Sequence, residues 1–332
     1  MNYIGSKKSL LDFLELSIDS IVPNVSGAVF ADFFAGTGIV GEAYKKKGCR
    51  IISNDIQYYS YVLNRHVIGN RPPLNDEKID YFNSLEECKD GFLYNNFCRG
   101  SGSGRNYFTD ENGRKCDAIR IEIERLYKLK EIGEDEYFSY LASLIDSVDK
   151  VANTASVYGA YLKHVKKSAE KSLNLERIPI VDGDEGNCVY NEDVQNLVQK
   201  VSGDILYLDP PYNARQYSSN YHVLETISRY DNPILTGVTG LRTKDENKSV
   251  YCSKRTVVKA FENLIDNARF KYVFLSYNNE GLMDFETIQG IMEKHGKYDV
   301  FSQDYRRFKA DKSEKRNHKA NRTTEYLHVL TR

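Results

Sequence analysis

The stretch Asp209-Pro-Pro-Tyr212 has the residue types needed to hold the exocyclic amino group of a nucleobase. That nitrogen is a poor nucleophile because its lone pair is delocalised into the ring, so a site that modifies it must supply hydrogen-bond acceptors. The Asp209 carboxylate and the Pro210 carbonyl can each accept one amino hydrogen, and Pro211 stiffens the turn without adding a competing N–H. Tyr212 offers a flat face on which a base can stack. Taken alone, the tetrapeptide also fits a plain turn that ends a buried strand.

A glycine-rich segment is the second chemical signal. Gly36-Thr-Gly38-Ile-Val-Gly41 matches the pattern G-x-G-x-x-G, and Asp55 follows Gly36 at about the 20-residue spacing of nucleotide-binding folds. Such glycines let the backbone approach a ligand closely, and the acid can accept both hydrogen bonds of a ribose diol. NAD, FAD and S-adenosylmethionine all carry this diol, and a tight turn without a ligand needs the same glycines. The loop alone does not choose a cofactor.

The elements around these motifs predict an α/β chain. Leu10–Val22 has the apolar spacing of an amphipathic helix, and helices are also expected at 42–47 and 58–66. Short apolar runs predict strands at 28–34, 50–55, 188–191, 204–209, 271–276, 298–305 and 325–330. Both motifs then follow the carboxyl ends of strands, where open α/β sheets bind ligands. The predicted fold is a Rossmann-like, mostly parallel sheet with helices between several of its strands.

One part of the chain has a different pattern. Residues 72–175 read as long polar and helical stretches around a Gly/Ser-rich loop, Arg99–Arg105, with no strand alternation. We predict that 72–175 is an inserted helical domain and that 1–71 and 176–332 form the α/β core.

The composition is that of a soluble globular protein, with 41% hydrophobic and 28% charged residues and a net charge of −1. This balance gives no sign of a polyanionic partner, so any such site must come from local clusters. The six cysteines include no C-x-x-C pair and no histidine at zinc-ligand spacing, which argues against structural zinc and fits a reducing compartment. Acids interrupt the N-terminal apolar residues, and no stretch reaches the roughly 18 apolar residues of a membrane helix. We expect a cytoplasmic protein with no membrane association.

Together the motifs resemble the amino methyltransferases that act on DNA, in the Dam-like alpha group that includes the adenine methylases of restriction-modification systems. Asn2-Tyr-Ile-Gly-Ser-Lys-Lys8 is similar to their motif X, Phe34-Ala-Gly-Thr-Gly38 to motif I and Asp209–Tyr212 to motif IV, in the order of the alpha group. Tyr3 and Ser6 depart from the usual tryptophan and glycine. The resemblance implies the mixed, Rossmann-like sheet of S-adenosylmethionine-dependent methyltransferases. It also implies a target-recognition domain between motifs I and IV, where the predicted helical insert lies.

The resemblance further implies a cofactor site. S-adenosylmethionine would be surrounded by Tyr3, Lys7, Asp32, Phe34, Ala35, Gly36, Gly38 and Asp55. Asp55 would bind the ribose hydroxyls and Asp193 the adenine amino group, with Glu192 as the alternative. The product would be S-adenosylhomocysteine, and no metal is implied. In this family the leading Asp209 favours adenine N6, because cytosine N4 enzymes more often begin the motif with serine.

A basic run provides a candidate phosphate contact. Residues 306–322 contain eight Lys or Arg residues against two acids. A solvated basic loop without a partner is the alternative. From this run and the segment after Tyr212, the predicted DNA-binding residues are Arg215, Tyr217, Tyr221, Arg306, Arg307, Lys309, Lys315 and Arg316. His222 is interpreted as structural rather than as a general base.

These observations predict a site-specific methyltransferase that flips an adenine out of double-stranded DNA and methylates its N6 from S-adenosylmethionine. A cognate restriction endonuclease would be its companion. The same chemistry on cytosine N4 or on RNA is the first alternative. An NAD-dependent oxidoreductase, read from Gly36 to Asp55, leaves Asp209–Tyr212 unexplained, and a non-catalytic DNA-binding scaffold leaves the same residues without a role.

Overall fold

The computed structural model describes residues 3–71, 77–243, 248–306 and 322–332, and the chain forms two compact units. The core unit comprises Gly5–Ile56, Val181–Gln216 and Asn247–Arg332. The helical unit comprises Met1–Ile4, Gln57–Ile180 and Tyr217–Glu246. Each unit has its own buried apolar cluster.

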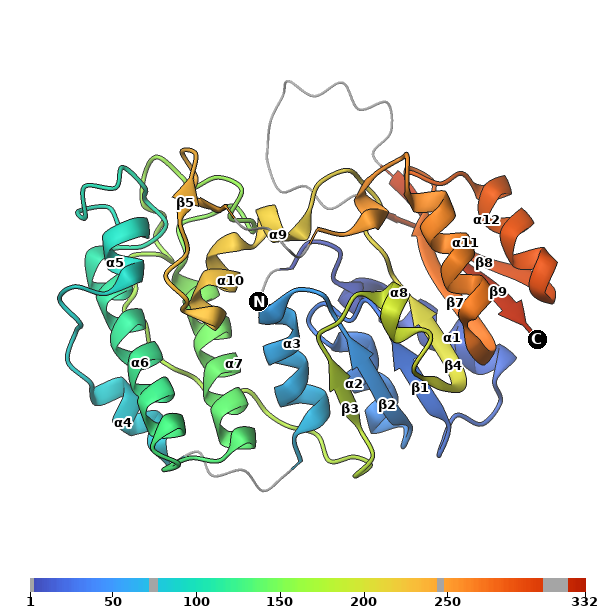
Figure 1. Ribbon diagram of the computed structural model, residues 1–332, viewed down its shortest axis with the longest axis horizontal. Coiled ribbons are helices and arrows are strands. Elements are labelled where there is room, and N and C mark those ends of the chain that lie inside the picture. The colour runs from blue at the N-terminus through green and yellow to red at the C-terminus, as the bar shows by residue number, and fades with distance from the viewer. Residues whose placement is uncertain (1–2, 72–76, 244–247, 307–321) are drawn as a thin grey trace. The chain divides into compact units, whose positions relative to one another are not determined.

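The core unit is built on a seven-stranded sheet in the order β3-β2-β1-β4-β7-β9-β8 (Figure 1). Its strands are β1 (Val29–Asp32), β2 (Arg50–Asn54), β3 (Cys188–Tyr190), β4 (Ser202–Leu208), β7 (Arg269–Asn278), β8 (Lys297–Arg306) and β9 (Arg322–Thr331). The strands from β3 to β7 run parallel, whereas β9 is antiparallel to both β7 and β8. Every strand expected from the sequence is present, and the predicted mixed α/β sheet is confirmed.

Helices pack on both faces of this sheet because successive strand residues point to opposite sides. On one face, Ala31, Leu206 and Val273 join an apolar cluster with the helices α8 (Val194–Leu197), α11 (Val257–Asn267) and α12 (Phe285–Met292). On the other face, the Phe30 ring stacks on Tyr44 of α2 (Ile39–Lys46), with centroids 4.1 Å apart. The remaining longer helix of the unit is α1 (Leu11–Ile21), which matches the predicted amphipathic helix.

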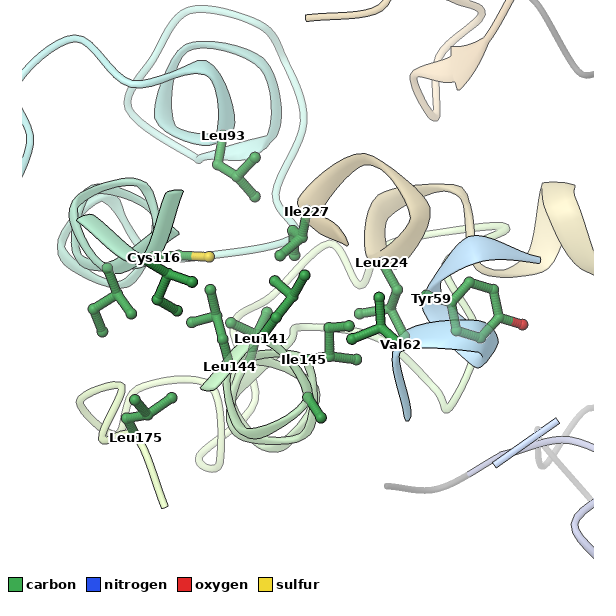
Figure 2. Close-up of a cluster of buried hydrophobic side chains, with 14 of the residues drawn as sticks. Tyr59, Val62, Leu93, Cys116, Leu141, Leu144, Ile145, Leu175, Leu224 and Ile227 are labelled. Carbon is green, nitrogen blue, oxygen red and sulfur yellow. The ribbon is translucent and has the colours of Figure 1, made fainter. Parts of the chain in front are cut away.

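The helical unit gathers apolar side chains from segments that are distant in sequence. Its helices are α3 (Tyr58–Asn64), α4 (Lys78–Ser84), α5 (Phe92–Phe97), α6 (Asp110–Lys128), α7 (Glu134–Val151), α9 (Tyr217–Asn220) and α10 (His222–Arg229), with a π-helical turn at Arg65–Gly69. A short hairpin of β5 (Leu235–Thr236) and β6 (Leu241–Arg242) completes it. Figure 2 shows side chains of α3, α6, α7 and α10 meeting in its core, among them Val62, Cys116, Leu141 and Leu224.

The helical unit is wider than the predicted insert of 72–175. It also takes Met1–Ile4, α3 and Tyr217–Glu246. Val223, Leu224 and Ile227 of α10 are fully buried in the same cluster as Val62 of α3. Helical spacing shows that these residues face a core, but it does not show which core, so the insert bounds could not be read from the sequence.

Candidate active site

The strand order places the ends of β1 and β4 side by side at a topological switch point. From β1 the chain goes on to β2 and β3 on one side, whereas β4 is followed in the sheet by β7 on the other side. In open α/β sheets ligands bind beyond the carboxyl ends of the strands at such a point. Asp32 at the end of β1 is in register with Tyr207 near the end of β4. The glycine segment and Asp209–Tyr212 are therefore neighbours.

The glycine segment forms a turn that only glycine accommodates without strain. Gly36 and Gly38 have φ angles of +52° and +81°, in the left-handed region, and α2 begins directly after Gly38. The Gly36 N–H donates to Asp55 Oδ2 at 2.9 Å, and the Ala35 N–H donates to the Asn54 carbonyl at 3.0 Å. The turn is thus tied to the end of β2, with the predicted ribose-binding acid beside it.

Tyr251 links other predicted cofactor residues, although the sequence did not single it out. Its ring lies 5.1 Å from that of Phe34, nearly perpendicular to it. Burial raises the pKa of Tyr251, and the nearby Asp193 carboxylate raises it further. Asn191 contributes on the same side, because its Nδ2 donates to the Asp55 carbonyl at 2.7 Å. Phe34, Asp55 and Asp193 therefore lie around the ends of neighbouring strands.

Asp193 and Glu192, the two acids considered for the adenine amino group of the cofactor, have different surroundings. Asp193 Oδ1 accepts the Gln195 N–H at 2.8 Å and caps α8, while its side chain stays partly exposed. Glu192 forms an ion pair with Lys200. Because Glu192 is paired with Lys200, Asp193 stays the candidate for the cofactor's adenine amino group.

Asp32 is a buried acid between the two motifs. Asp32 is 1% exposed, and its Oδ1 accepts a hydrogen bond from the Phe34 N–H at 3.3 Å. Burial raises the pKa of Asp32, and the Asp209 charge raises it further. The switch point therefore brings two acidic groups close together, and the neutral form of Asp32 is favoured there.

Asp209 faces a lysine and a tyrosine through one of its two oxygens. Lys7 Nζ lies 3.0 Å from Asp209 Oδ1, and the Tyr212 hydroxyl donates to the same oxygen at 2.6 Å. Lys7 Nζ also donates to the Tyr212 hydroxyl and lies 4.7 Å from the centroid of that ring. Lys7 was expected only at the cofactor; the structure adds contacts with the motif that follows β4. Among the residues that the structure describes, none forms a hydrogen bond or ion pair with Asp209 Oδ2.

Glu325 and Ser276 belong to this cluster and were missed by sequence reasoning. Glu325 Oε1 lies 2.9 Å from Lys7 Nζ and accepts the Tyr212 hydroxyl at 2.7 Å and the Ser276 hydroxyl at 2.5 Å. Both residues are 0% exposed and lie on paired strands, β9 and β7. An acid at the start of the otherwise mostly apolar run 325–330 was the signal that could have found Glu325.

Burial dominates the electrostatics of Asp209. Burial and the Glu325 charge raise the pKa of this carboxyl, whereas Lys7 and the Tyr212 hydrogen bond lower it. Together they leave the pKa raised, at about 6. The side chain is 17% exposed, so one edge of it reaches solvent. Asp209 is thus ionised at neutral pH and available as an acceptor.

The predicted aromatic contacts differ in exposure. Tyr221 is fully buried and its hydroxyl accepts the Ile4 N–H at 2.7 Å, so its prediction as a DNA contact is wrong in this structure. Its burial follows from ring packing in the helical unit, where Tyr3 stacks on it at 4.7 Å. Tyr217 is partly buried and donates to the Ile4 carbonyl at 3.2 Å. Tyr3 itself belongs to the helical unit, and its hydroxyl lies 3.0 Å from that of Tyr59.

The predicted basic contacts are only partly described. Arg215 is exposed on the core unit. Arg306 ends β8, and the remaining predicted residues, Arg307, Lys309, Lys315 and Arg316, lie outside the described residues. His222 is 1% exposed, with its ring nitrogens 3.1 Å and 2.8 Å from the carbonyls of Ser219 and Thr239, which fits the structural role.

The fold and these residues define a class. A parallel sheet with an antiparallel strand inserted before its edge strand, a glycine turn after β1 and Asp-Pro-Pro-Tyr after β4 define a Rossmann-like methyltransferase that acts on amino groups. The sequence model of the D12 class N6 adenine-specific DNA methyltransferases matches residues 3–322. The chain belongs to this family, and its reaction is adenine-specific methylation of DNA. Cytosine N4, RNA and NAD chemistry, which the residues alone left open, are not supported.

Relatives agree with this assignment along the whole chain. The type II methyltransferase M.NlaIII of Neisseria lactamica is 53% identical over 333 residues, which cover 99% of each chain. M.CviAII of Paramecium bursaria Chlorella virus 1 is 36% identical over 317 residues, 93% of each chain. M.FokI of Planomicrobium okeanokoites is 40% identical over 344 residues, which cover 99% of this chain and 52% of that enzyme.

Two further findings concern the described residues only. None of the helices in the described ranges is long and apolar enough to cross a membrane. In the same ranges, no three His, Cys, Asp or Glu side chains are grouped so that they could hold a metal ion.

Proposed function

We propose that the core unit binds S-adenosylmethionine at the ends of β1, β2 and β3. Gly36 and Gly38 let the backbone approach the ligand, and Asp55 beside them accepts the ribose hydroxyls. Phe34 and Asp193 flank the place of the adenine ring, near Tyr251. These residues fit the cofactor: Asp55 offers a carboxylate to the ribose diol, Asp193 offers one to the adenine amino group, and Phe34 offers an aromatic ring to the purine. When bound, the cofactor supplies an electrophilic methyl group on a sulfonium.

We further propose that Asp209–Tyr212 hold the adenine to be methylated. The observation that carries this is the one-sided environment of Asp209: the ion pair with Lys7 and the hydrogen bond from Tyr212 both involve Oδ1, and the side chain is 17% exposed. Oδ2 can then accept one hydrogen of the adenine amino group. The Pro210 carbonyl, which accepts no hydrogen bond from any described residue, can accept the other. Two acceptors favour the more tetrahedral nitrogen that develops as the methyl group arrives.

The test is the variant Asp209→Ala. It removes the acceptor but leaves the glycine turn, so tritium transfer from labelled cofactor to DNA should vanish while calorimetric binding of the cofactor persists. Asp182→Ala, which changes an exposed acid of the core unit, is the matched control and should keep full activity. Full transfer by Asp209→Ala would refute the catalytic role.

The same proposal includes base flipping and a restriction-modification context. A base inside a duplex cannot reach Asp209, so the adenine must be rotated out, and 2-aminopurine at the target position should fluoresce more strongly on binding. Arg215 and the basic run 306–322 are proposed phosphate contacts in duplex DNA. The names of the relatives as type II methyltransferases support a cognate endonuclease as partner. Protection of plasmid DNA from a matching endonuclease tests this.

A further inference from the structure

Glu325 is a buried carboxylate that reaches the catalytic turn from the far end of the chain. It is 0% exposed on β9, and its Oε1 accepts from Lys7 Nζ, the Tyr212 hydroxyl and the Ser276 hydroxyl. Its Oε2 is buried and has no hydrogen-bond partner in the described part of the structure. A buried carboxylate with one unpaired oxygen is costly, so its presence is not explained by stability alone.

The hydrogen-bond donors of the cluster are shared unequally. Tyr212 has one hydroxyl hydrogen, and two carboxylate oxygens lie within reach of it, Asp209 Oδ1 at 2.6 Å and Glu325 Oε1 at 2.7 Å. Lys7 has three hydrogens, which can go to both carboxylates and to the Tyr212 oxygen. Glu325 therefore fixes where Lys7 and Tyr212 stand relative to Asp209.

From this geometry we propose that Glu325 is a positioning residue for methyl transfer, which acts through Lys7 and Tyr212 on the orientation of Asp209. With Lys7 and Tyr212 anchored on Glu325, both meet Asp209 at Oδ1, and the carboxylate is turned so that Oδ2 faces the substrate amino group. Glu325 itself touches no substrate. The inference rests on the catalytic role proposed for Asp209.

Glu325 also limits how strongly Lys7 can neutralise Asp209. The titratable groups that face Asp209 are Lys7 from the N-terminal segment, Glu325 from β9, Tyr212 from its own turn, Asp32 from β1 and Tyr207 from β4. Glu325 raises the pKa of Asp209 because it is a like charge, and it competes for the same lysine. Removing the Glu325 charge should therefore lower the pKa of Asp209.

Glu325→Gln separates charge from shape. The amide oxygen can take the place of Oε1 and keep the hydrogen bonds from Lys7, Tyr212 and Ser276. The amide nitrogen takes the place of Oε2, which has no hydrogen-bond partner among the described residues. We expect kcat at neutral pH to stay within a few fold, while the acid limb of kcat moves down by about 1 pH unit. Asp299→Asn, on the exposed side of β8, removes the same charge and should leave the limb in place.

Glu325→Ala removes the anchor as well. Lys7 and Tyr212 then lose their fixed positions, and kcat should fall about 100-fold, with little change in KM for cofactor or DNA. Urea unfolding of each variant shows whether it is folded. Should Glu325→Ala fail to fold, Glu325→Gln decides the question by its pH profile.

Asp209→Ala, measured in parallel, separates the two proposals. Suppose that Asp209→Ala loses transfer but that the acid limb of the kcat profile of Glu325→Gln coincides with that of the unmodified enzyme. This result would overturn the role of Glu325 and keep that of Asp209. Full transfer by Asp209→Ala would instead refute the proposed function on which this inference rests. A shifted limb in Glu325→Gln and a lower kcat in folded Glu325→Ala would support both.

Discussion

Replacing Lys7 by methionine should change the pH dependence of the reaction more than its maximum rate. Lys7 is 6% exposed, with Nζ 3.0 Å from Asp209 Oδ1 and 2.9 Å from Glu325 Oε1. At 3.0 Å and an effective dielectric constant near 20, the attraction between Lys7 and Asp209 is about 5 kcal/mol. That energy corresponds to a change of roughly 4 in the pKa of Asp209, of which we expect at least about 2 to remain after relaxation.

The sign of the change follows from the charges. Lys7 lowers the pKa of Asp209, which stands at about 6 in its presence. Without Lys7, two buried carboxylates face each other across Tyr212, and Asp209 becomes protonated at neutral pH. A protonated Asp209 accepts the amino hydrogen poorly, so kcat at pH 7 should drop by about 10-fold or more and recover as the pH rises.

The assay is tritium transfer at saturating DNA and cofactor, from about pH 5.5 to about pH 9.5. Urea unfolding should show a loss of about 3–5 kcal/mol, because removing Lys7 leaves a buried carboxylate without its compensating charge. Lys8→Met, at the exposed neighbouring lysine, is the matched control and should reproduce the unmodified profile. A Lys7→Met profile lowered by one constant factor at every pH would refute the electrostatic reasoning.

Two further variants test the fold around the site. Gly38→Ala forces a side chain into a φ of +81°, at a cost of about 1–2 kcal/mol, and should weaken calorimetric binding of S-adenosylmethionine. Gly290→Ala in α12, with open space at its Cβ position, is the control and should leave binding unchanged. His328 is buried, and burial lowers its pKa from 6.5 to about 4. The fold therefore has its full stability above pH 6.5, where the ring is neutral, and loses part of it as the pH falls toward 4. The loss amounts to about 3 kcal/mol, and His328→Gln should flatten that part of the stability profile measured by urea unfolding.

The parts of the site that sequence reasoning located are those encoded locally. The glycine turn and Asp209–Tyr212 each follow a strand within a few residues, and parallel strand ends share one edge of a sheet. Glu325 and Ser276 come together with Lys7 only through the register of β9 on β7 and the path of the N-terminal segment. No local sequence pattern specifies the register of β9 on β7.

The same limit explains the errors in assigning residues to units. Tyr221 lies nine residues after Tyr212, and this position in the sequence made it a candidate for contact with DNA. Its burial against Tyr3 and Ile4 depends on packing within the helical unit. The helix α10 was not among the predicted elements, and its apolar residues Val223, Leu224 and Ile227 are buried in the core of the helical unit.

The charge of the site has a consequence that neither motif shows alone. Asp32, Asp209 and Glu325 are three largely buried acids at the switch point, and Lys7 is the basic side chain described among them. One ammonium cannot neutralise three carboxylates, so burial favours either a bound proton or a bound cation. The raised pKa of Asp32 expresses the first outcome in the protein alone. A sulfonium donor would provide the second, and it would lower the pKa of Asp209 at the stage of the reaction where an ionised acceptor is needed.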